Sequence, residues 1–581
     1  MTRETVLARE RSRGVDVLGA TGVAAAFALC GLLLGQPAHG DAIYVGASEA
    51  LCGATSIPAA LDLASATTAD DEIRLTRTLA YTGVQIQILE WDSDNTGDLV
   101  ISGGWDDCLD GVPQGRTTLT GTGAGFLLGV MGTTGAPQAL EVTLRDLELT
   151  GGVTGIGSIG ETRLLVEGSR IHGNERGGIA AGGGRLEIDA ATVVEENAND
   201  SLGGGLACFE AGSRLVVAGT VRANAAENAG GGIGALDGCV VELRAGATIE
   251  HNSAERGGGM ALGDGAWAEG GGAGVLPVRI AHNIATLVGG GIYLVGPAPR
   301  SLLGNVQIES NSAEAGAGVY VAADVVLQLE RFNFESCANP DRCTTLSRNR
   351  TTAAGGLGSA ALVSDGAELR MMQGFIEENG GDGEASLLLA AYGTAAIVLE
   401  GVQIWGNDTE SIFSAVNGGN ILAGFVTAAA NRYWDEVSES FVDSAGARAV
   451  NASSIEIYTS ILTDHEPFEA TAGSTIVGDC LMVETEEGIE AEVSMVGVDP
   501  RFRNAAAGDL HLRFDSPAID SCDTEVYTPL DIDFDLDPRG SDSPTRPNVL
   551  GPFDRGADES PLLFASGFEA GNLTGWSAAQ P

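Results

Sequence analysis

The chain of 581 residues contains no lysine, so all 31 of its basic residues are arginine, and 79 acidic residues bring the formal net charge to −48. So large a negative charge repels phosphate backbones and anionic membrane surfaces, which excludes nucleic acid and such membranes as partners. Cations, neutral glycans and basic proteins stay open as partners. An alternative interpretation is that the acidity only confers solubility in a salty or extracellular medium.

Long apolar segments are equally scarce. Four arginines among the first 13 residues precede one apolar stretch, residues 17–34, and the small residues Ala38 and Gly40 follow it. This order is typical of a signal peptide, residues 1–40, that is cleaved before Asp41. The alternative is an uncleaved membrane anchor. Because no second stretch of this kind follows, we expect no integral membrane segment after cleavage, and a secreted, extracellular or bacterial cell-surface protein.

The strongest regularity is a nine-fold repeat in which an aliphatic residue precedes an asparagine by three positions. Successive asparagines lie 23 to 38 residues apart. Periods of this length indicate stacked units whose apolar faces are buried only against neighbouring units. The repeated asparagines are Asn174, Asn197, Asn224, Asn252, Asn283, Asn311, Asn349, Asn379 and Asn407.

Each repeat consists of short runs in which apolar and polar residues alternate. After Asn283, for example, a glycine triplet ends at Gly291 and the run Ile292-Tyr293-Leu294 follows. Alternation at period two marks half-buried strands, and no run in this region has the period of an amphipathic helix. Three short strands per repeat, without helices between them, predict an all-β fold: a right-handed parallel β-helix solenoid with three short strands per coil.

The repeated residues have physical reasons to recur. A tight bend between strands needs a positive φ, which glycine adopts without penalty, and glycine also lets neighbouring coils approach where a Cβ would clash. Asparagine tolerates the left-handed conformation. Stacked one per coil at ~4.8 Å, asparagines are expected to form a ladder of side-chain amides. We interpret this column as structural, with substrate binding as the alternative.

Two motifs of residues 165–410 resemble a known family. Gly-Gly-Gly-aliphatic and aliphatic-x-x-Asn, seen at Gly257-Gly258-Gly259-Met260 and at Ile249 to Asn252, are similar to the repeats of the polymorphic outer membrane protein family. The passenger regions of that family are β-helical and surface-exposed. The resemblance therefore implies the same fold and a position at the cell surface.

The two ends of the repeat region resemble caps. Residues 57–64 have the pattern of a short amphipathic helix that opens at Pro58, as at the start of secreted pectate-lyase-like β-helix proteins. Such a helix hides apolar core and strand edges. Residues 501–560, with Asp537-Pro538-Arg539-Gly540 and Gly556-Ala557-Asp558-Glu559, resemble a C-terminal module of bacterial surface β-helix proteins. We predict a β-helix with its N-terminal cap at 41–500, a C-terminal capping module at 501–560 and a tail at 561–581.

Cysteine counting agrees with export. Removal of the signal peptide takes away Cys30 and leaves eight cysteines, an even number that suggests disulfides in an exported chain. No Cys-x-x-Cys pair or cluster of histidines accompanies them, which argues against zinc as their ligand. Sequence order and coil spacing favour the pairs Cys52–Cys108, Cys208–Cys239, Cys337–Cys343 and Cys480–Cys522.

The catalytic motifs of parallel β-helix enzymes are missing. Polysaccharide lyases of this fold pair calcium-binding carboxylates with an arginine or lysine base, and pectin hydrolases combine Asn-Thr-Asp, Asp-Asp, Gly-His-Gly and Arg-Ile-Lys. Here Gly-His-Gly and Asn-Thr-Asp are absent, and the lack of lysine excludes Arg-Ile-Lys. Asp70-Asp71 and Asp106-Asp107 stand without the other motifs. We therefore assign no catalytic, cofactor-binding or metal-binding residue.

Two smaller groups of residues have the composition of metal sites. His251 and His282 each precede a repeated asparagine, so they are expected to stack on adjacent coils, where a solvated pair is favoured over a metal site. Four aspartates alternate along one segment and would share one face if it were extended, which suggests calcium. The segment lacks the glycine and the distal glutamate of an EF-hand. These aspartates are Asp531, Asp533, Asp535 and Asp537.

The sequence favours a monomeric β-helix protein with a structural, adhesive or glycan-binding role, whose partners are polysaccharide or cell-surface components. The alternative is a polysaccharide lyase or glycoside hydrolase that acts on extracellular polysaccharide. The two hypotheses differ in the surface that they require. An enzyme needs a groove where carboxylates and arginines converge, whereas an adhesive protein needs flat, regular side-chain ladders.

Overall fold

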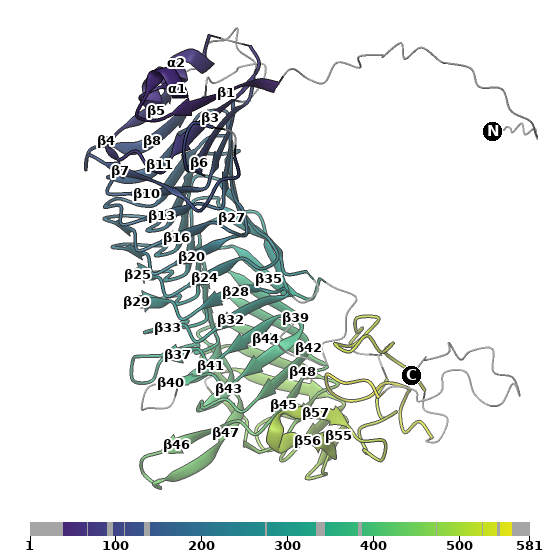
Figure 1. Ribbon diagram of the computed structural model, residues 1–581. Coiled ribbons are helices and arrows are strands. Elements are labelled where there is room, and N and C mark those ends of the chain that lie inside the picture. Colours follow the sequence, from purple (N-terminus) through teal and green to yellow (C-terminus); the bar gives the residue numbers. More distant parts are fainter. Residues whose placement is uncertain are drawn as a thin grey trace, which may run out of the picture. The chain divides into compact units, whose positions relative to one another are not determined.

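The computed structural model consists of short parallel strands that stack coil upon coil, from β1 at the N-terminal end to β55 (Figure 1). It describes residues 39–66, 68–89, 97–109, 111–132, 140–273, 276–332, 343–381, 386–471, 473–523, 525, 527–542 and 547–560. The predicted signal peptide and tail therefore lie outside the described residues, apart from His39 and Gly40, which begin β1 (His39–Val45). The all-β parallel β-helix predicted from the repeat is confirmed.

Three columns of strands make up the walls of the β-helix. One column is a sheet of its own, and the other two merge into the largest sheet where β39 and β42 run through both of them. One coil thus consists of β26, β27 and β28, and the next of β30, β31 and β32. The prediction of three short strands per coil is confirmed.

The strands are bounded as follows. The first column contains β3 (Asp70–Thr76), β6 (Leu99–Trp105), β9 (Leu140–Arg145), β12 (Thr162–Glu167), β15 (Arg185–Ile188), β19 (Arg214–Val217), β23 (Val240–Leu243), β27 (Trp267–Gly271), β31 (Ser301–Gly304), β35 (Val326–Glu330), β39 (Glu368–Glu377), β42 (Ala396–Trp405), β44 (Asn420–Gly424), β48 (Ser454–Tyr458), β52 (Thr475–Asp479) and β54 (Glu490–Ala491). The second contains β4 (Tyr81–Val84), β7 (Thr117–Gly121), β10 (Leu147–Thr150), β13 (Arg170–His172), β16 (Val193–Glu195), β20 (Thr220–Arg222), β24 (Thr248–Glu250), β28 (Val278–Ala281), β32 (Val306–Glu309), β36 (Thr345–Ser347), then β39 and β42, β45 (Thr427–Ala429), β49 (Ile461–Leu462), β53 (Leu481–Val483) and β55 (Ser494–Val496).

The third column ends in a hairpin. It contains β5 (Ile86–Leu89), β8 (Phe126–Met131), β11 (Thr154–Ile159), β14 (Ile179–Gly182), β18 (Leu206–Phe209), β22 (Ile233–Ala235), β26 (Met260–Leu262), β30 (Ile292–Val295), β34 (Val319–Ala322), β38 (Ala361–Ser364), β41 (Leu387–Tyr392), β43 (Ser411–Val416) and β47 (Ser440–Val450). The first half of β47 pairs antiparallel with β46 (Arg432–Asp435), and this hairpin projects from the stack (Figure 1). The second half of β47 pairs with β50 (His465–Glu466) and β51 (Glu469–Ala470).

The aliphatic residues of the repeat align in register inside the stack. Ile249 pairs with Ile280, Ile280 with Ile308, and Ile308 with Leu346, and all four are fully buried. Because side chains alternate between the two faces of a strand, a slip of one residue would turn this whole file outward. The continuous apolar interior therefore determines the register of the coils.

The asparagines form the predicted ladder beside this core. The Nδ2 of Asn283 donates to the Oδ1 of Asn311 at 3.0 Å and to the carbonyl of Ile249, in the preceding coil, at 2.9 Å. Its own Oδ1 accepts from the backbone N–H and the Nδ2 of Asn252, both at 3.0 Å. Every member is buried, and a tenth, Asn431, extends the ladder beyond the nine predicted, since Asn407 donates to it at 2.8 Å.

The left-handed residue is not the asparagine, as the sequence suggested, but the residue before it. His251 and His282 have φ values of 56° and 54°, and the equivalent Ala223 and Ser310 have 52° and 53°. The asparagine itself stays outside that region, because its amide must point into the ladder. The prediction for the glycines is confirmed: Gly289 has a φ of 70°, and a Cβ on its neighbour Gly290 would lie 2.5 Å from a backbone oxygen of the next coil.

A fourth strand of two to five residues follows the asparagine in seven coils, in addition to the three that the sequence predicted. These strands pair in parallel as a sheet of their own, because the coils on either side keep equivalent residues in register. They are β17 (Ala198–Asn199), β21 (Ala225–Ala226), β25 (Ser253–Arg256), β29 (Ile284–Val288), β33 (Ser312–Ala313), β37 (Arg350–Thr351) and β40 (Gly380–Gly381).

A short helix covers the N-terminal end of the core, as predicted. Helix α2 (Ile57–Ala64) begins after Ser56, whose hydroxyl accepts from the N–H of Ala59, and Pro58 occupies its first turn. The residues that face the core are Ile57, Ala60 and Ala64, which are buried. A second helix, α1 (Glu49–Cys52), precedes β2 (Gly53–Ala54).

Three of the predicted disulfides are present among the described residues: Cys52–Cys108, Cys208–Cys239 and Cys480–Cys522, with Cα–Cα distances of 4.9, 6.1 and 5.9 Å. Cys208–Cys239 joins adjacent coils, as expected from its spacing. Cys343 is disulfide-bonded as well, whereas its predicted partner Cys337 lies outside the described residues. No helix in the described ranges is both long and apolar enough to cross a membrane.

The C-terminal segment, residues 501–560, packs along the flank of several coils (Figure 1). Its only regular elements among the described residues are the antiparallel pair β56 (Phe502–Asn504) and β57 (Asp509–Leu512) and the 3-10 turn Ala505–Ala507. Residues of the coils between β35 and β49 hold it by hydrogen bonds of 2.6 to 2.8 Å. The side chains of Arg331, Gln373 and Trp405 donate to the carbonyls of Phe534, Ile532 and Ala505, respectively. The hydroxyl of Thr427 accepts from the N–H of Ala557, and the carbonyl of Thr459 accepts from the N–H of Gly556.

Replacing one rung of the ladder tests its energetic role. We expect Asn283→Ala to lower the free energy of unfolding by about 3 kcal/mol. The change removes the acceptor of the backbone N–H and of one side-chain N–H of Asn252, and it removes the side-chain donor to the carbonyl of Ile249. Asn283→Asp should also destabilise, since it keeps the acceptor and removes the donor. Urea unfolding measures both. The matched control is His282→Gly, an exposed neighbour with a positive φ, and an equal loss in that variant would contradict the assignment.

Candidate functional site

The acidic pairs noted in the sequence do not converge. Asp71 pairs with Leu99 at the start of β6, whereas Asp106 follows the end of β6 and forms an ion pair with Arg77. The two pairs thus stand at opposite ends of adjacent strands. Asp107 accepts a hydrogen bond from the N–H of Leu109. These contacts are those of turns at a strand end.

His251 and His282 stack as predicted. Their ring centroids are 4.9 Å apart with an angle of 23° between the planes, and both residues are exposed. Among the described residues, no third histidine, cysteine or carboxylate lies close enough to join them as a metal ligand. The geometry agrees with the solvated pair that the sequence favoured.

The four alternating aspartates do not share one face, because their segment is not extended. Residues 531–537 form a loop that is closed by an antiparallel bridge between Ile532 and Pro538. The carboxylate of Asp533 accepts from the N–H groups of Asp535, Asp537 and Glu559 at 2.8 to 2.9 Å. The buried carboxylate of Asp533 therefore holds the loop together by hydrogen bonds. The row of four aspartates on one face, which suggested calcium, is not formed.

Buried carboxylates hold together the rest of the C-terminal segment as well. Asp554 accepts from the N–H groups of Asp520 and Ser560, and Glu559 accepts from those of Gly540 and Ser541. Burial raises the pKa of Asp533 to about 7, and it also raises the pKa of Asp554 above its ordinary value. In an irregular chain these side chains replace the partners that a β-sheet would supply.

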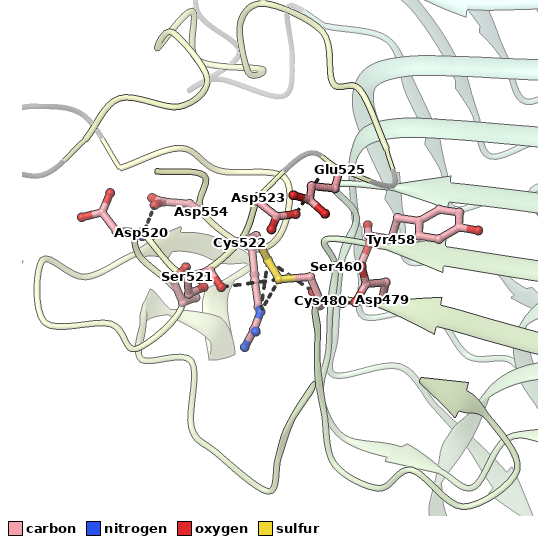
Figure 2. The surroundings of a disulfide bond; sticks show 12 residues. Tyr458, Ser460, Asp479, Cys480, Asp520, Ser521, Cys522, Asp523, Glu525 and Asp554 are labelled. Carbon is pink, nitrogen blue, oxygen red and sulfur yellow. Dashed lines mark hydrogen bonds between the residues drawn. A yellow bond between two sulfur atoms is a disulfide. The ribbon is translucent and has the colours of Figure 1, made fainter. Parts of the chain in front are cut away.

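A disulfide attaches this segment to the β-helix (Figure 2). A buried arginine of the segment contacts both of its sulfurs. Cys480 follows strand β52, and Cys522 belongs to the C-terminal segment. The Nε of Arg555 lies 3.4 and 3.3 Å from the sulfurs of Cys480 and Cys522. Burial lowers the pKa of Arg555 to about 10, and the charge of Asp479 opposes that shift.

A ladder of alternating charges covers the outer face of the second column. Glu195 accepts from Arg170 on β13 at 2.5 Å and from Arg222 on β20 at 2.6 Å, and Arg170 reaches on to Glu148 on β10 at 2.9 Å. A similar run links Glu250, Arg279, Glu309 and Arg348. Arginine and glutamate side chains thus alternate from coil to coil on this face.

A polar cleft of about 360 Å³ lies where the hairpin leaves the stack. The β46–β47 hairpin forms one wall, and β43, β50 and β51 supply the others. Its lining residues are Glu410, Ser411, Tyr433, Val442, Asp443, Ala445, Arg448, Glu466, Pro467 and Glu469. The pairing explains why they meet, since Arg448 on β47 stands between Ser414 on β43 and Glu469 on β51.

Arg448 organises the charges of this cleft. Its Nη1 lies 3.6 Å from the carboxylate of Glu410, and its Nε lies 3.3 Å from that of Glu469. Burial and the nearby carboxylates, Glu410 first among them, raise the pKa of the Tyr433 hydroxyl. The hydroxyl therefore stays protonated at neutral pH. The cleft thus offers a guanidinium and a phenol as donors and several carboxylates as acceptors.

An exposed apolar tip lies on the same hairpin. Trp434 on β46 and Phe441 on β47 pair across the hairpin edge to face, with centroids 5.3 Å apart, and they are 49% and 57% exposed. Val437 in the connecting turn is 94% exposed. The carboxylate of Asp435 accepts from the N–H groups of Ser438 and Val437, which fixes the turn. The hairpin therefore holds two aromatic side chains in solvent.

Sequence reasoning missed the cleft and the hairpin. Arg432-Tyr433-Trp434-Asp435 is short, and its partner lies beyond a turn without glycine or proline, so no hairpin signal stands out. The concentration of aromatics at 433, 434 and 441, in a chain with 5% aromatic residues, is the one signal that was available. The convergence of Glu410, Arg448 and Glu469 depends on the stacking of three coils.

The fold thus defines the class of this protein as an all-β parallel β-helix. No protein-family model matches the chain, and none of the curated proteins matches it either. The resemblance to polymorphic outer membrane protein repeats accordingly rests on the repeated residues alone.

The charge ladder makes a prediction about acid stability. Burial alone would raise the pKa of Glu195, but hydrogen bonds from Arg170 and Arg222 hold it below its ordinary value. A carboxyl with a depressed pKa contributes stability above its unfolded pKa of about 4.3, and that stability is lost as the pH falls through the folded pKa.

We expect Glu195→Gln to destabilise the protein by about 1 kcal/mol at pH 7 and to lose less further stability than the wild type between pH 7 and 3.5. Urea unfolding at the two pH values measures this difference. Glu196→Gln, which alters an exposed carboxylate next to the ladder, is the control. Parallel pH profiles for wild type and Glu195→Gln would contradict the role of the ladder.

Proposed function

We propose that this protein is a secreted or cell-surface β-helix that binds neutral glycans through the β46–β47 hairpin and its adjoining cleft. The pair Trp434 and Phe441 carries this proposal. Two large aromatic side chains in solvent, held by a fixed turn, are costly to display unless a ligand covers them. A sugar ring offers such side chains an apolar face of C–H groups.

The cleft suits the hydroxyl groups of the same ligand. Hydroxyls donate to carboxylates such as Glu410 and Glu469 and accept from Arg448 and Tyr433. The surrounding carboxylates and the net charge of −48 disfavour uronic or sulfated polymers. A neutral polysaccharide is therefore the class of ligand that fits both the apolar tip and the polar cleft.

Disulfides support the extracellular position. Cys52–Cys108, Cys208–Cys239 and Cys480–Cys522 persist in oxidising compartments. The predicted signal peptide agrees with that position. The interlocked coils also suit a role as a stiff support for the binding hairpin, because each coil is held to the next along its whole length.

Hydrolysis is the second candidate function, and the carboxylates of the cleft favour it. Asp443 on β47 and Glu466 on β50 line the same cleft from neighbouring strands, as an acid and a base of a glycoside hydrolase must. A lyase fits less well. The arginine in the cleft, Arg448, is already ion-paired with the carboxylates of Glu410 and Glu469 and so is not free to face a substrate as the base.

A binding experiment tests the main proposal. We expect wild-type protein to bind members of an immobilised panel of neutral polysaccharides in biolayer interferometry, and Trp434→Ala/Phe441→Ala to bind them at least about tenfold more weakly, since each aromatic contact contributes about 1 kcal/mol. Phe514→Ala, which removes an aromatic side chain 77% exposed outside the hairpin, is the control and should bind like the wild type.

The same panel separates binding from catalysis. If wild type releases reducing ends and Asp443→Asn does not, the protein is a hydrolase and the adhesive proposal falls. Binding of anionic polysaccharides in preference to neutral ones, or equal binding by the hairpin variant, would also contradict the proposal.

A further inference from the structure

A histidine of the C-terminal segment lies among three carboxylates. His511 on β57 places its Nε2 at 2.5 Å from Asp535 and its Nδ1 at 2.5 Å from Asp509. Potential ligand atoms of His511, Asp535 and Asp558 all lie within 4.8 Å of one another. The three residues come from β57, from the loop after residue 530 and from the end of the segment, so the cluster joins separate parts of the chain.

Asp558 supplies an independent observation. Its side chain is 1% exposed, and its Oδ2 accepts from the N–H of Leu512 at 2.6 Å. Its Oδ1 is buried and has no hydrogen-bond partner among the described residues. A buried carboxylate oxygen without a partner calls for an explanation, and an ion is one.

The second nitrogen of His511 is oriented as in metal sites. A metal-bound histidine usually gives its other N–H to a carboxylate, which fixes the ring and its tautomer. Asp509 accepts from Nδ1 and so leaves Nε2 directed at Asp535. The position of Asp509 two residues before His511 on the same strand places both side chains on one face.

We propose that His511, Asp535 and Asp558 bind one divalent cation of the zinc class, with Asp509 orienting the imidazole. Imidazole is a ligand for zinc and related transition metals, whereas calcium and magnesium prefer oxygen ligands alone. One histidine and two carboxylates leave a fourth position of a tetrahedral site for water. Metal–ligand distances of about 2.1 Å require ligand atoms roughly 3.4 Å apart, so Asp535 moves away from His511 by about 1 Å on binding.

The site has a structural consequence. The cation would join β57, the loop of Asp535 and the end of the segment at one point. Binding to the folded state alone stabilises that state in proportion to the metal concentration. Burial lowers the pKa of His511, but the hydrogen bonds to Asp535 and Asp509 and the charge of Asp558 raise that pKa to about 9. The cation therefore also competes with a proton.

Titration of the full, disulfide-intact chain with zinc tests the proposal at pH 8. After dialysis against a chelator, we expect calorimetry to show one Zn²⁺ per chain for wild type and for His251→Gln, which alters the surface histidine pair. Asp558→Asn and Asp535→Asn should lose this binding, and Asp509→Asn should weaken it by 10- to 100-fold. A hundredfold excess of Ca²⁺ should not compete.

Two further measurements keep the outcome clear. Circular dichroism shows whether each variant keeps the β-helix. Asp535→Asn should disturb the structure less than Asp558→Asn, because the side chain of Asp535 is 15% exposed and that of Asp558 is buried. Cobalt added to wild type should produce the absorption bands of a tetrahedral ion, and Asp535→Asn should abolish them. The proposal is wrong if wild type binds no zinc, if Asp558→Asn and Asp535→Asn bind it equally well, or if calcium displaces it.

Discussion

The asparagine ladder is the interaction on which the rest of the structure depends. Each amide is buried. Its donors and acceptors are satisfied by the asparagines of the neighbouring coils and by a carbonyl of the coil before, as at Asn283, and Asn197 and Asn407 also donate to a carbonyl two residues earlier in their own coil. A coil that slipped would leave several buried polar groups unpaired at once. The ladder therefore enforces the same register as the apolar file beside it, and the two constraints act together.

A stack fixed in this way tolerates variation at the bends. The asparagines lie between 23 and 38 residues apart, yet every rung is formed, because additional residues leave the stack between strands. The β46–β47 hairpin is such an addition: β46 and the first half of β47 lie between Asn431 and Ser444, where the chain rejoins the third column. In the proposed binding site, the stacked coils supply Glu410 and Glu469, while the hairpin supplies Tyr433 and its aromatic neighbours.

The C-terminal segment is stabilised by different means. It lacks stacked neighbours, so buried carboxylates accept its backbone N–H groups, a disulfide joins it to β52, and Arg539 contacts the ring of Phe425 at 4.3 Å. The motif Gly556-Ala557-Asp558-Glu559 has a structural explanation in these contacts. Asp558 departs from the pattern, because only one of its oxygens has a hydrogen-bond partner among the described residues.

The sequence by itself determined the fold class, the ladder, the helix at residues 57–64 and three disulfides, because each depends on short-range periodicity or on spacing along the chain. It missed Asn431, whose preceding aliphatic position is the small Ala428, and it placed the left-handed residue one position too late. Only the tertiary structure decided where the cleft and the cluster around His511 lie. The cleft brings together Arg448, Glu410 and Glu469 because the coils stack. His511 meets Asp558 because an irregular segment folds back along the coils. Local sequence encodes neither of these contacts, because the residues are far apart along the chain.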